Sequence, residues 1–150
     1  MSGPSFRFSL ERVRALRERT EDAAKEALAG AMQDRQRSER DVQDAAEAVL
    51  RAHRAQLDAS ARPMNAHDLI ARQAYLERSE LAHRASQETL SHTERQVDAR
   101  RSELTEAARD RQALDRLKEH RRSDHERELA RQENLELDEI ALNGFRRRAA

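Results

Sequence analysis

The chain has few of the residues from which compact domains build their cores. It contains no cysteine and no tryptophan, and aromatic residues make up only 3% of its 150 residues. Without cysteine, neither a disulfide framework nor a cysteine-ligated metal centre is possible. Because large aromatic side chains are this scarce, a sizeable globular core is excluded, and two classes remain: a disordered chain or an assembly of long helices.

Proline and glycine, which interrupt helices, are also rare: the sequence has two prolines and three glycines. Charged residues make up 39% of the chain, with 29 basic and 29 acidic side chains. A composition rich in Ala, Glu, Arg, Leu and Gln, with no net charge, favours long helices over disorder. The sequence therefore predicts an all-α protein.

The charge balance and the apolar runs exclude further classes. Nucleic-acid binding requires a basic excess, and neither residues 1–60 nor residues 61–150 carry one. No apolar run reaches membrane-spanning length, and the first residues, "MSGPSFRFSLERV", lack the apolar core of a signal peptide. We therefore expect a cytosolic protein with no nucleic-acid partner.

One clear break divides the chain, at "SARPMNAHD". Pro63 removes a helical hydrogen bond and clashes with the preceding turn, and Asn65 is a good N-cap for a new helix with Asp68 in its first turn. At the other end, Ser9 is the expected cap, with Phe8 and Val13 at the spacing of a hydrophobic staple. A start at Ser5 is the alternative. We predict helices over about 9–60 and 66–143, with a turn at about 61–65.

Helices this long are stable only if they pair along their length, as in a coiled coil. Residues 33–41 and 91–96 contain no apolar residue, and these two gaps are mirror images about residue 65. An antiparallel hairpin folded at Pro63 would place one gap against the other, although two such gaps can also coincide by chance. The sequence predicts one coiled-coil domain over 1–150, a long two-helix antiparallel hairpin. The apolar residues expected to support the hairpin include Leu10, Val13, Leu16, Leu28, Met32, Val42, Val49, Leu50, Leu57, Leu69, Leu81, Leu90, Val97, Leu104, Leu114 and Leu117.

A dense apolar run closes the chain, after eleven residues, Lys118 to Glu128, without any apolar side chain. On a helical wheel, Leu129, Leu137 and Ile140 share one side, and Leu135, Leu142 and Phe145 lie on the other. A helix that is apolar on two sides is normally covered on two sides. Folded about residue 65, Leu129 would face residue 1, so the run from Leu129 to Phe145 would extend beyond the first helix. We expect another protein, or alternatively a second copy, to cover it.

Catalytic and metal-binding motifs are missing from the sequence. The six histidines form no H-E-x-x-H pair, the three glycines are isolated, and no serine lies in a nucleophile elbow. Carboxylates on charged helices usually form i, i+4 pairs or are solvated. We therefore expect no enzyme activity, no cofactor, no metal and no small-molecule substrate.

Both ends of the chain resemble one family. The opening "FRFSLERVRALRER" and the closing "LDRLKEHRRSDHERELARQENLELDEIALNGFRRR" resemble the FliJ proteins of the flagellar type III export apparatus, and the length and the two-helix layout match as well. The secretion stalk proteins of injectisomes are close relatives. The resemblance implies a stalk-like protein, monomeric when free and peripherally associated with the inner face of the cell membrane. Its implied partners are a hexameric export ATPase, an export-gate membrane protein and export chaperones.

The resemblance also suggests two binding sites. The paired termini would enter the bore of the ATPase, and an aromatic and aliphatic patch on both helices would contact the gate. The ATPase-binding candidates are Phe6, Phe8, Leu10, Leu129, Leu135, Leu137, Ile140, Leu142 and Phe145. The gate-binding candidates are Val42, Ala46, Val49, His53, Tyr75, Leu76, Ser79 and Ala82. For Tyr75, simple packing on the first helix near His53 or Ala55 is the alternative, and for the whole chain it is a self-assembling structural coiled coil.

Overall fold

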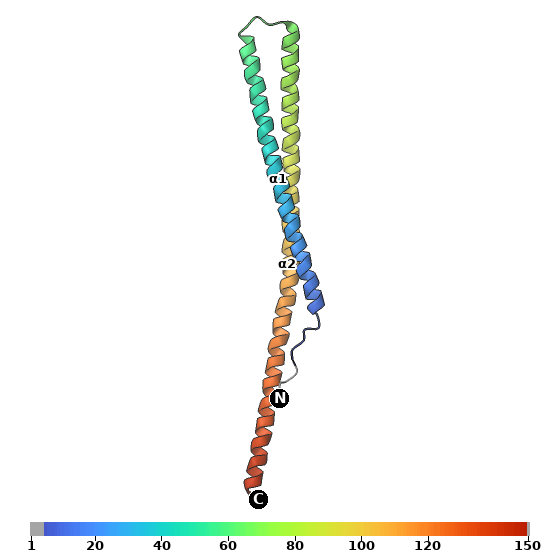
Figure 1. The fold of residues 1–150 in the computed structure, drawn as a ribbon, viewed down its shortest axis with the longest axis vertical. Coiled ribbons are helices and arrows are strands. Elements are labelled where there is room, and N and C mark those ends of the chain that lie inside the picture. Colours follow the sequence, from blue (N-terminus) through green and yellow to red (C-terminus); the bar gives the residue numbers. More distant parts are fainter. Residues whose placement is uncertain (1–4, 150) are drawn as a thin grey trace. The chain divides into compact units, whose positions relative to one another are not determined.

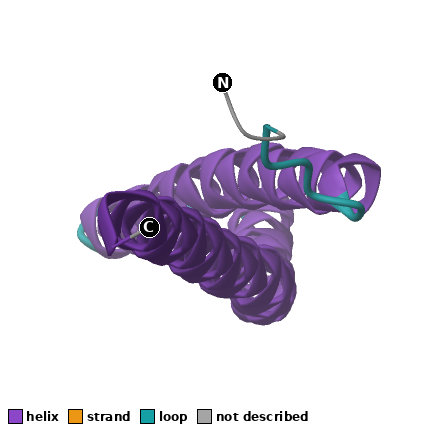
Figure 2. Cartoon of the chain, turned by 90° about the horizontal axis from the view of Figure 1, so that it is seen from below, coloured by secondary structure: helices purple, strands orange, loops and turns teal. Residues whose placement is uncertain are grey.

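The structure, a computed structural model, describes residues 5–149. Two helices account for most of them: α1 spans Glu11–Ser60 and α2 spans Ala66–Ala149 (Figure 1). The remainder of the described chain is loop, without any strand (Figure 2). The prediction of an all-α protein made of two long paired helices is confirmed.

The start of α1 differs from the prediction. α1 begins at Glu11, and residues 5–8 are not helical, so neither Ser9 nor Ser5 caps the helix. The Ser9 hydroxyl instead accepts a hydrogen bond from Arg121 Nη1 at 3.1 Å. The predicted staple is also wrong, because a helix that starts at Glu11 does not place Phe8 and Val13 at the required spacing, and Val13 is exposed.

The start of α2 agrees with the prediction, and its end does not. The backbone N–H of His67 donates to Asn65 Oδ1 at 3.2 Å, and Asp68 lies in the first turn, as expected for this N-cap. α2 was predicted to end near residue 143, yet it continues through Gly144 to Ala149. No proline follows to stop it, and Arg146, Arg147 and Arg148 suit the negative end of the helix dipole.

The chain divides into two compact units. The turn unit comprises Asp22–Thr105, and the terminal unit comprises residues up to Glu21 together with those from Glu106 onward. Within the turn unit, Gln56 Nε2 donates to Gln73 Oε1 at 3.2 Å. Within the terminal unit, Arg14 Nε donates to Asp115 Oδ1 at 2.6 Å. Both pairs are nearly symmetrical about residue 65, so the helices of each unit pair in an antiparallel manner about the predicted fold point.

The seam of the turn unit, the line along which its two helices pack, is narrow and partly polar. Its buried residues recur at steps of three and four, with Ala31, Ser38 and Ala52 on α1 and Leu76, Ser79, Thr93 and Val97 on α2. Thr93 and Ser79 donate their hydroxyls to the carbonyls of Leu90 and Tyr75 in their own helix, so these buried groups are hydrogen-bonded. Val97 is only 1% exposed, and each of the two predicted apolar gaps contains a buried hydroxyl-bearing residue, Ser38 in the first and Thr93 in the second.

The prediction that the large apolar residues would all support the pairing is wrong for several of them. Val13, Leu16, Met32, Leu50, Leu57, Leu69 and Leu81 are exposed. Leu50 and Leu57 each follow a seam-facing residue, Val49 or Gln56, and one residue along an α-helix is a rotation of about 100°. These leucines therefore point away from α2.

Candidate functional site: protein-interaction surfaces

The last turns of α2 form an exposed apolar surface, as the sequence predicted. We call residues 130–148 the tail; every one of them is exposed, and its large apolar side chains expose between 55% and 73% of their area. These side chains are Leu135, Leu137, Ile140, Leu142 and Phe145. Large apolar surface left in water is costly, and a contiguous exposed patch commonly marks a protein-interaction site.

The tail is apolar on two opposite faces because α2 remains a regular helix through Ala149. Leu135 and Leu142 continue the three-and-four spacing of the α2 seam, and Phe145 lies beside them. Leu137 and Ile140 lie on the other side of the helix. A single helix packed along the line of the seam would cover the first face and leave the second face in water.

The N-terminal arm, residues 5–10, covers part of α2 just before the tail. Phe8 is buried, and Phe6, Leu10 and Leu129 are half-buried. The ring of Phe6 lies 5.8 Å from the ring of His125, centroid to centroid. A shallow groove lined by Ser5, Phe6, Lys118, Arg122 and Leu129 brings Phe6 and Leu129 together.

The predicted ATPase-binding residues therefore separate into two groups. Phe6, Phe8, Leu10 and Leu129 are at least partly covered within the terminal unit. The other candidates lie in the tail, where nothing described in the structure covers them. The position of Leu129 relative to residue 1, which the sequence suggested, lies outside the described residues.

The predicted gate-binding residues lie in the turn unit with unequal exposure. Leu76 and Ser79 are buried in the seam, and Val42, Ala46 and Val49 are half-buried. The more accessible candidates are Tyr75, which is half exposed, together with His53 and Ala82. Among the gate candidates, these three are the ones that the structure leaves exposed.

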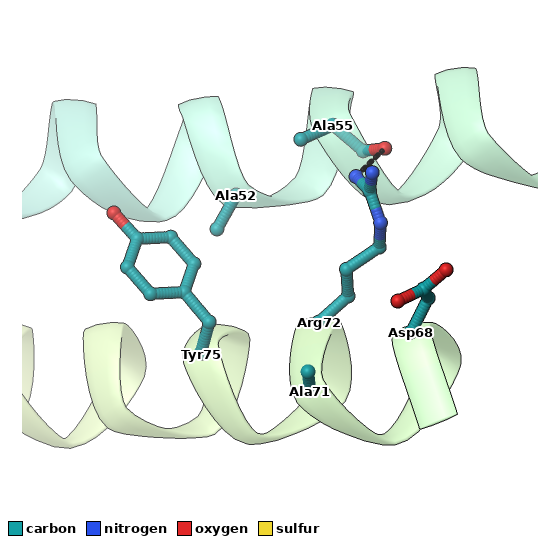
Figure 3. A pocket seen from close by; sticks show the side chains of 6 residues that line it. All are labelled: Ala52, Ala55, Asp68, Ala71, Arg72 and Tyr75. Atoms are coloured by element: carbon teal, nitrogen blue, oxygen red, sulfur yellow. Dashed lines mark hydrogen bonds between the residues drawn. The ribbon is translucent and has the colours of Figure 1, made fainter. Parts of the chain in front are cut away.

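The accessible gate candidates lie on opposite flanks of the seam. Tyr75 lies beside Ala52 in a shallow pocket, where Arg72 Nη1 donates to the carbonyl of Ala55 at 3.1 Å (Figure 3). His53 instead faces Glu80, with Nε2 and Oε1 3.6 Å apart. Helical spacing places Ala55 and His53 on different sides of Ala52, and Tyr75 and Glu80 on different sides of Leu76. The structure therefore does not join Tyr75 and His53 in one patch, and the alternative that Tyr75 packs near Ala55 describes its position.

A further exposed apolar group near the turn was not proposed as a site from the sequence. Leu57, Leu69 and Ile70 are exposed, and Leu69 and Ile70 line a shallow groove with Gln56 and Gln73. This groove lies on the same flank of the seam as His53. Leu57 directly follows Gln56, a half-buried residue of the seam, and one residue along the helix is a rotation of about 100° that turns Leu57 away from α2.

The described residues contain no cluster of three or more His, Asp or Glu side chains able to hold a metal ion. Within the described residues, neither α1 nor α2 contains an apolar stretch long enough to cross a membrane. The surfaces with exposed apolar side chains described above are the tail and the flanks of the turn unit.

Comparison with known proteins gives these surfaces a context. The sequence matches the family model described as flagellar FliJ protein over residues 6–150. The chain belongs to the FliJ family. Its fold is similar to that of CT670 from Chlamydia trachomatis, a solved structure described as a homologue of YscO. The similarity has a TM-score of 0.72 at 16% sequence identity and covers 91% of this chain and 93% of that one. A search of curated proteins found no match to this sequence.

Proposed function

We propose that this FliJ-family protein is a stalk-like component of the flagellar type III export apparatus that binds the hexameric export ATPase through its tail. The observation that carries the proposal is a helix whose large apolar side chains are exposed on two opposite faces. A ring of subunits surrounding the tail would cover both faces at once, whereas one flat partner surface would cover only one. Membership of the FliJ family supports the same partner.

The contribution of the protein is mechanical and regulatory, without chemistry of its own. The tail occupies the bore of the ATPase and promotes assembly or activity of the hexamer. Arg146, Arg147 and Arg148 at the end of the tail steer it toward an acidic surface. The protein acts in the cytoplasm and associates peripherally with the membrane through its partners.

A second contact, with the export-gate membrane protein, uses the turn unit. Leu76 and Ser79 are buried in the seam, so we do not assign them a direct contact with the gate. We assign the main role to Tyr75 and Ala82, which are exposed on the same flank of the seam. Val42, Ala46, Val49 and His53 would belong to a separate contact on the other flank. Escort of export chaperones is the third role implied by the family.

Hydrolysis by the cognate export ATPase tests the proposal directly. The full chain is compared with a truncation that ends at Glu128, which keeps the contacts of Ser9 and Phe6 with Arg121 and His125. We expect the full chain to stimulate hydrolysis and the truncation to lose that stimulation. Before the assay, circular dichroism and solution mass establish that both chains are helical and equal in assembly state.

Point variants separate the two faces of the tail. Leu135→Ser with Leu142→Ser removes the face in line with the seam, and Leu137→Ser with Ile140→Ser removes the opposite face. An enclosing partner predicts that either double substitution reduces stimulation. Leu57→Ser is the matched control, because this leucine is 72% exposed in the turn unit. A helical full-length protein that forms a stable dimer and leaves hydrolysis unchanged would instead favour a self-assembling coiled coil.

A further inference from the structure

Charged side chains occupy the seam where α1 begins. Continuing the spacing of three and four residues backward from Ala24 leads to Glu21, Arg17 and Arg14. Glu21 is buried, with 6% of its area exposed. The apolar residues of this segment, Val13 and Leu16, are 41% and 61% exposed. The start of α1 therefore presents charge toward α2 and apolar side chains toward water, which reverses the usual amphipathic arrangement.

Ion pairs connect these charges to α2 within the terminal unit. Arg14 donates to Asp115 at 2.6 Å, and Arg17 Nη1 lies 3.0 Å from Asp110 Oδ2. Arg111 donates both to Glu21 and to Asp115. One turn further, Lys118 Nζ donates to Glu11 Oε2 at 2.8 Å. The pairs form a ladder along the two helices, linked at Asp115.

The arm adds polar contacts to this ladder. It lies on residues 118–129 of α2, a segment that offers no apolar side chain before Leu129. Two contacts hold the arm on α2: the hydrogen bond from Arg121 to Ser9 and the ring contact between Phe6 and His125. The ring of Phe6 therefore lies beside long charged side chains such as Lys118 and Arg122, whose stems are apolar.

Such contacts respond to ionic strength in a way that an apolar seam does not. Attraction between solvent-accessible charges is screened over about 10 Å at 0.1 M salt and about 3 Å at 1 M. Salt does not screen the burial of Ala52, Leu76 or Val97 in the turn unit. Rising salt therefore weakens the contacts of the terminal unit but does not weaken the apolar contacts of the turn unit.

We propose that residues 5–21 form an electrostatic latch that detaches from α2 as ionic strength rises, while the turn unit stays paired. Detachment would uncover Ala107, Leu114 and Leu117 of α2 together with Phe8, and so add apolar surface beside the tail. Lowered pKa values of Asp115 and Glu11, caused first by hydrogen bonds from Arg14 and Lys118 respectively, are consistent with these pairs. The latch concerns the free chain and does not depend on the identity of its partner.

Hydrogen exchange measured by mass spectrometry on the full chain tests the latch. Exchange is compared at about 0.05 M and about 1 M sodium chloride. We expect backbone amides of residues 15–21 to exchange about tenfold faster at high salt, and those of residues 45–52 to change less than about twofold. Equal acceleration of both segments, or none in residues 15–21, would overturn the proposal.

Charge variants assign the effect to the ladder. Arg17 and Asp110 form a simple pair, so Arg17→Asp and Asp110→Arg are each expected to accelerate exchange in residues 15–21 at low salt, and the double variant is expected to restore protection. Glu47→Arg changes an exposed charge in the turn unit and serves as the control. If the double variant exchanges as fast as the single variants, attraction between these charges does not hold the segment and the latch is rejected.

Discussion

In the turn unit the helices meet through small and hydroxyl-bearing side chains such as Ala52, Ser38 and Thr93, whereas in the terminal unit they meet through Arg14, Arg17 and Glu21. Both seams keep the same spacing of three and four residues. Small side chains let helices approach closely and exclude water, while long charged ones bridge a wider and wetter interface. Regular coiled-coil spacing therefore does not by itself establish an apolar seam.

Breaking the seam of the turn unit should have the largest effect. Val97→Asp would place a carboxylate where the native side chain is 1% exposed. We expect the free energy of unfolding to fall by about 3 kcal/mol or more, because moving a charge from water into the seam is strongly unfavourable and the apolar contacts of Val97 are lost. Thermal and urea unfolding followed by circular dichroism measure it. Leu57→Asp, at a position 72% exposed, should remain close to the parent protein.

Acidification should loosen the terminal unit before the turn unit. The pKa of Asp115 is lowered chiefly by the hydrogen bond from Arg14, and that of Glu11 chiefly by the hydrogen bond from Lys118. A carboxyl with a lowered pKa in the folded state stabilises it above the unfolded value, near 4, and this contribution is lost as the pH falls below that value. Exchange in residues 11–21 should accelerate between about pH 5 and pH 3, after correction for the intrinsic rates. Equal loss of protection in residues 45–52 would contradict this prediction.

Replacing glycine with alanine in a paired helix and in the unpaired tail compares the stability of the two regions. An added Cβ at Gly30 or at Gly144 would meet no atom within 4 Å apart from its own helix, and both residues are helical. Gly30→Ala should raise the free energy of unfolding by about 0.5–1 kcal/mol, because alanine loses less backbone entropy in a helix. Gly144→Ala lies in the tail and should increase helicity there with little change in the global melt. Equal shifts of the melting curve for both variants would show that the tail unfolds together with the paired helices.

The smallest effect is expected at exposed ion pairs within one helix. Glu47 Oε2 and Arg51 Nη1 lie 3.7 Å apart on the surface of α1. Replacing Glu47 with Gln should change the free energy of unfolding by less than about 0.5 kcal/mol. A larger loss in urea unfolding would mean that charges matter to the turn unit as much as to the terminal unit.

Much of the architecture was readable from residue types. Pro63 and Asn65 located the turn and the start of α2, and scarce glycine and proline indicated two long helices. The mirror symmetry about residue 65 predicted where the hairpin folds, and the pairs Gln56–Gln73 and Arg14–Asp115 are nearly symmetrical about that point. The exposed tail was also predictable, because α2, with 84 residues, is longer than α1, with 50.

Other features could not be read from the sequence. The end of α2 was predicted too early: the helix continues through Gly144 to Ala149, because glycine only weakens a helix and no proline interrupts this stretch. The predicted N-cap at Ser9 is wrong because its hydroxyl accepts a hydrogen bond from Arg121, which is 112 residues away in the chain. The candidate gate residues looked like one patch, and only the seam position showed that Tyr75 and His53 lie on different flanks.

The sequence by itself determined that this protein is a pair of long antiparallel helices whose second member ends in an unpaired apolar segment. Helix propensity and the effect of Pro63 are local, so they can be read from residue types. The tertiary structure alone decided which side chains face the partner helix. That choice is collective, since the same spacing must be kept on both helices over many turns, and one residue of shift rotates every side chain by about 100°. It therefore placed Arg14, Arg17 and Glu21 in the seam and left Leu16 and Leu57 in water.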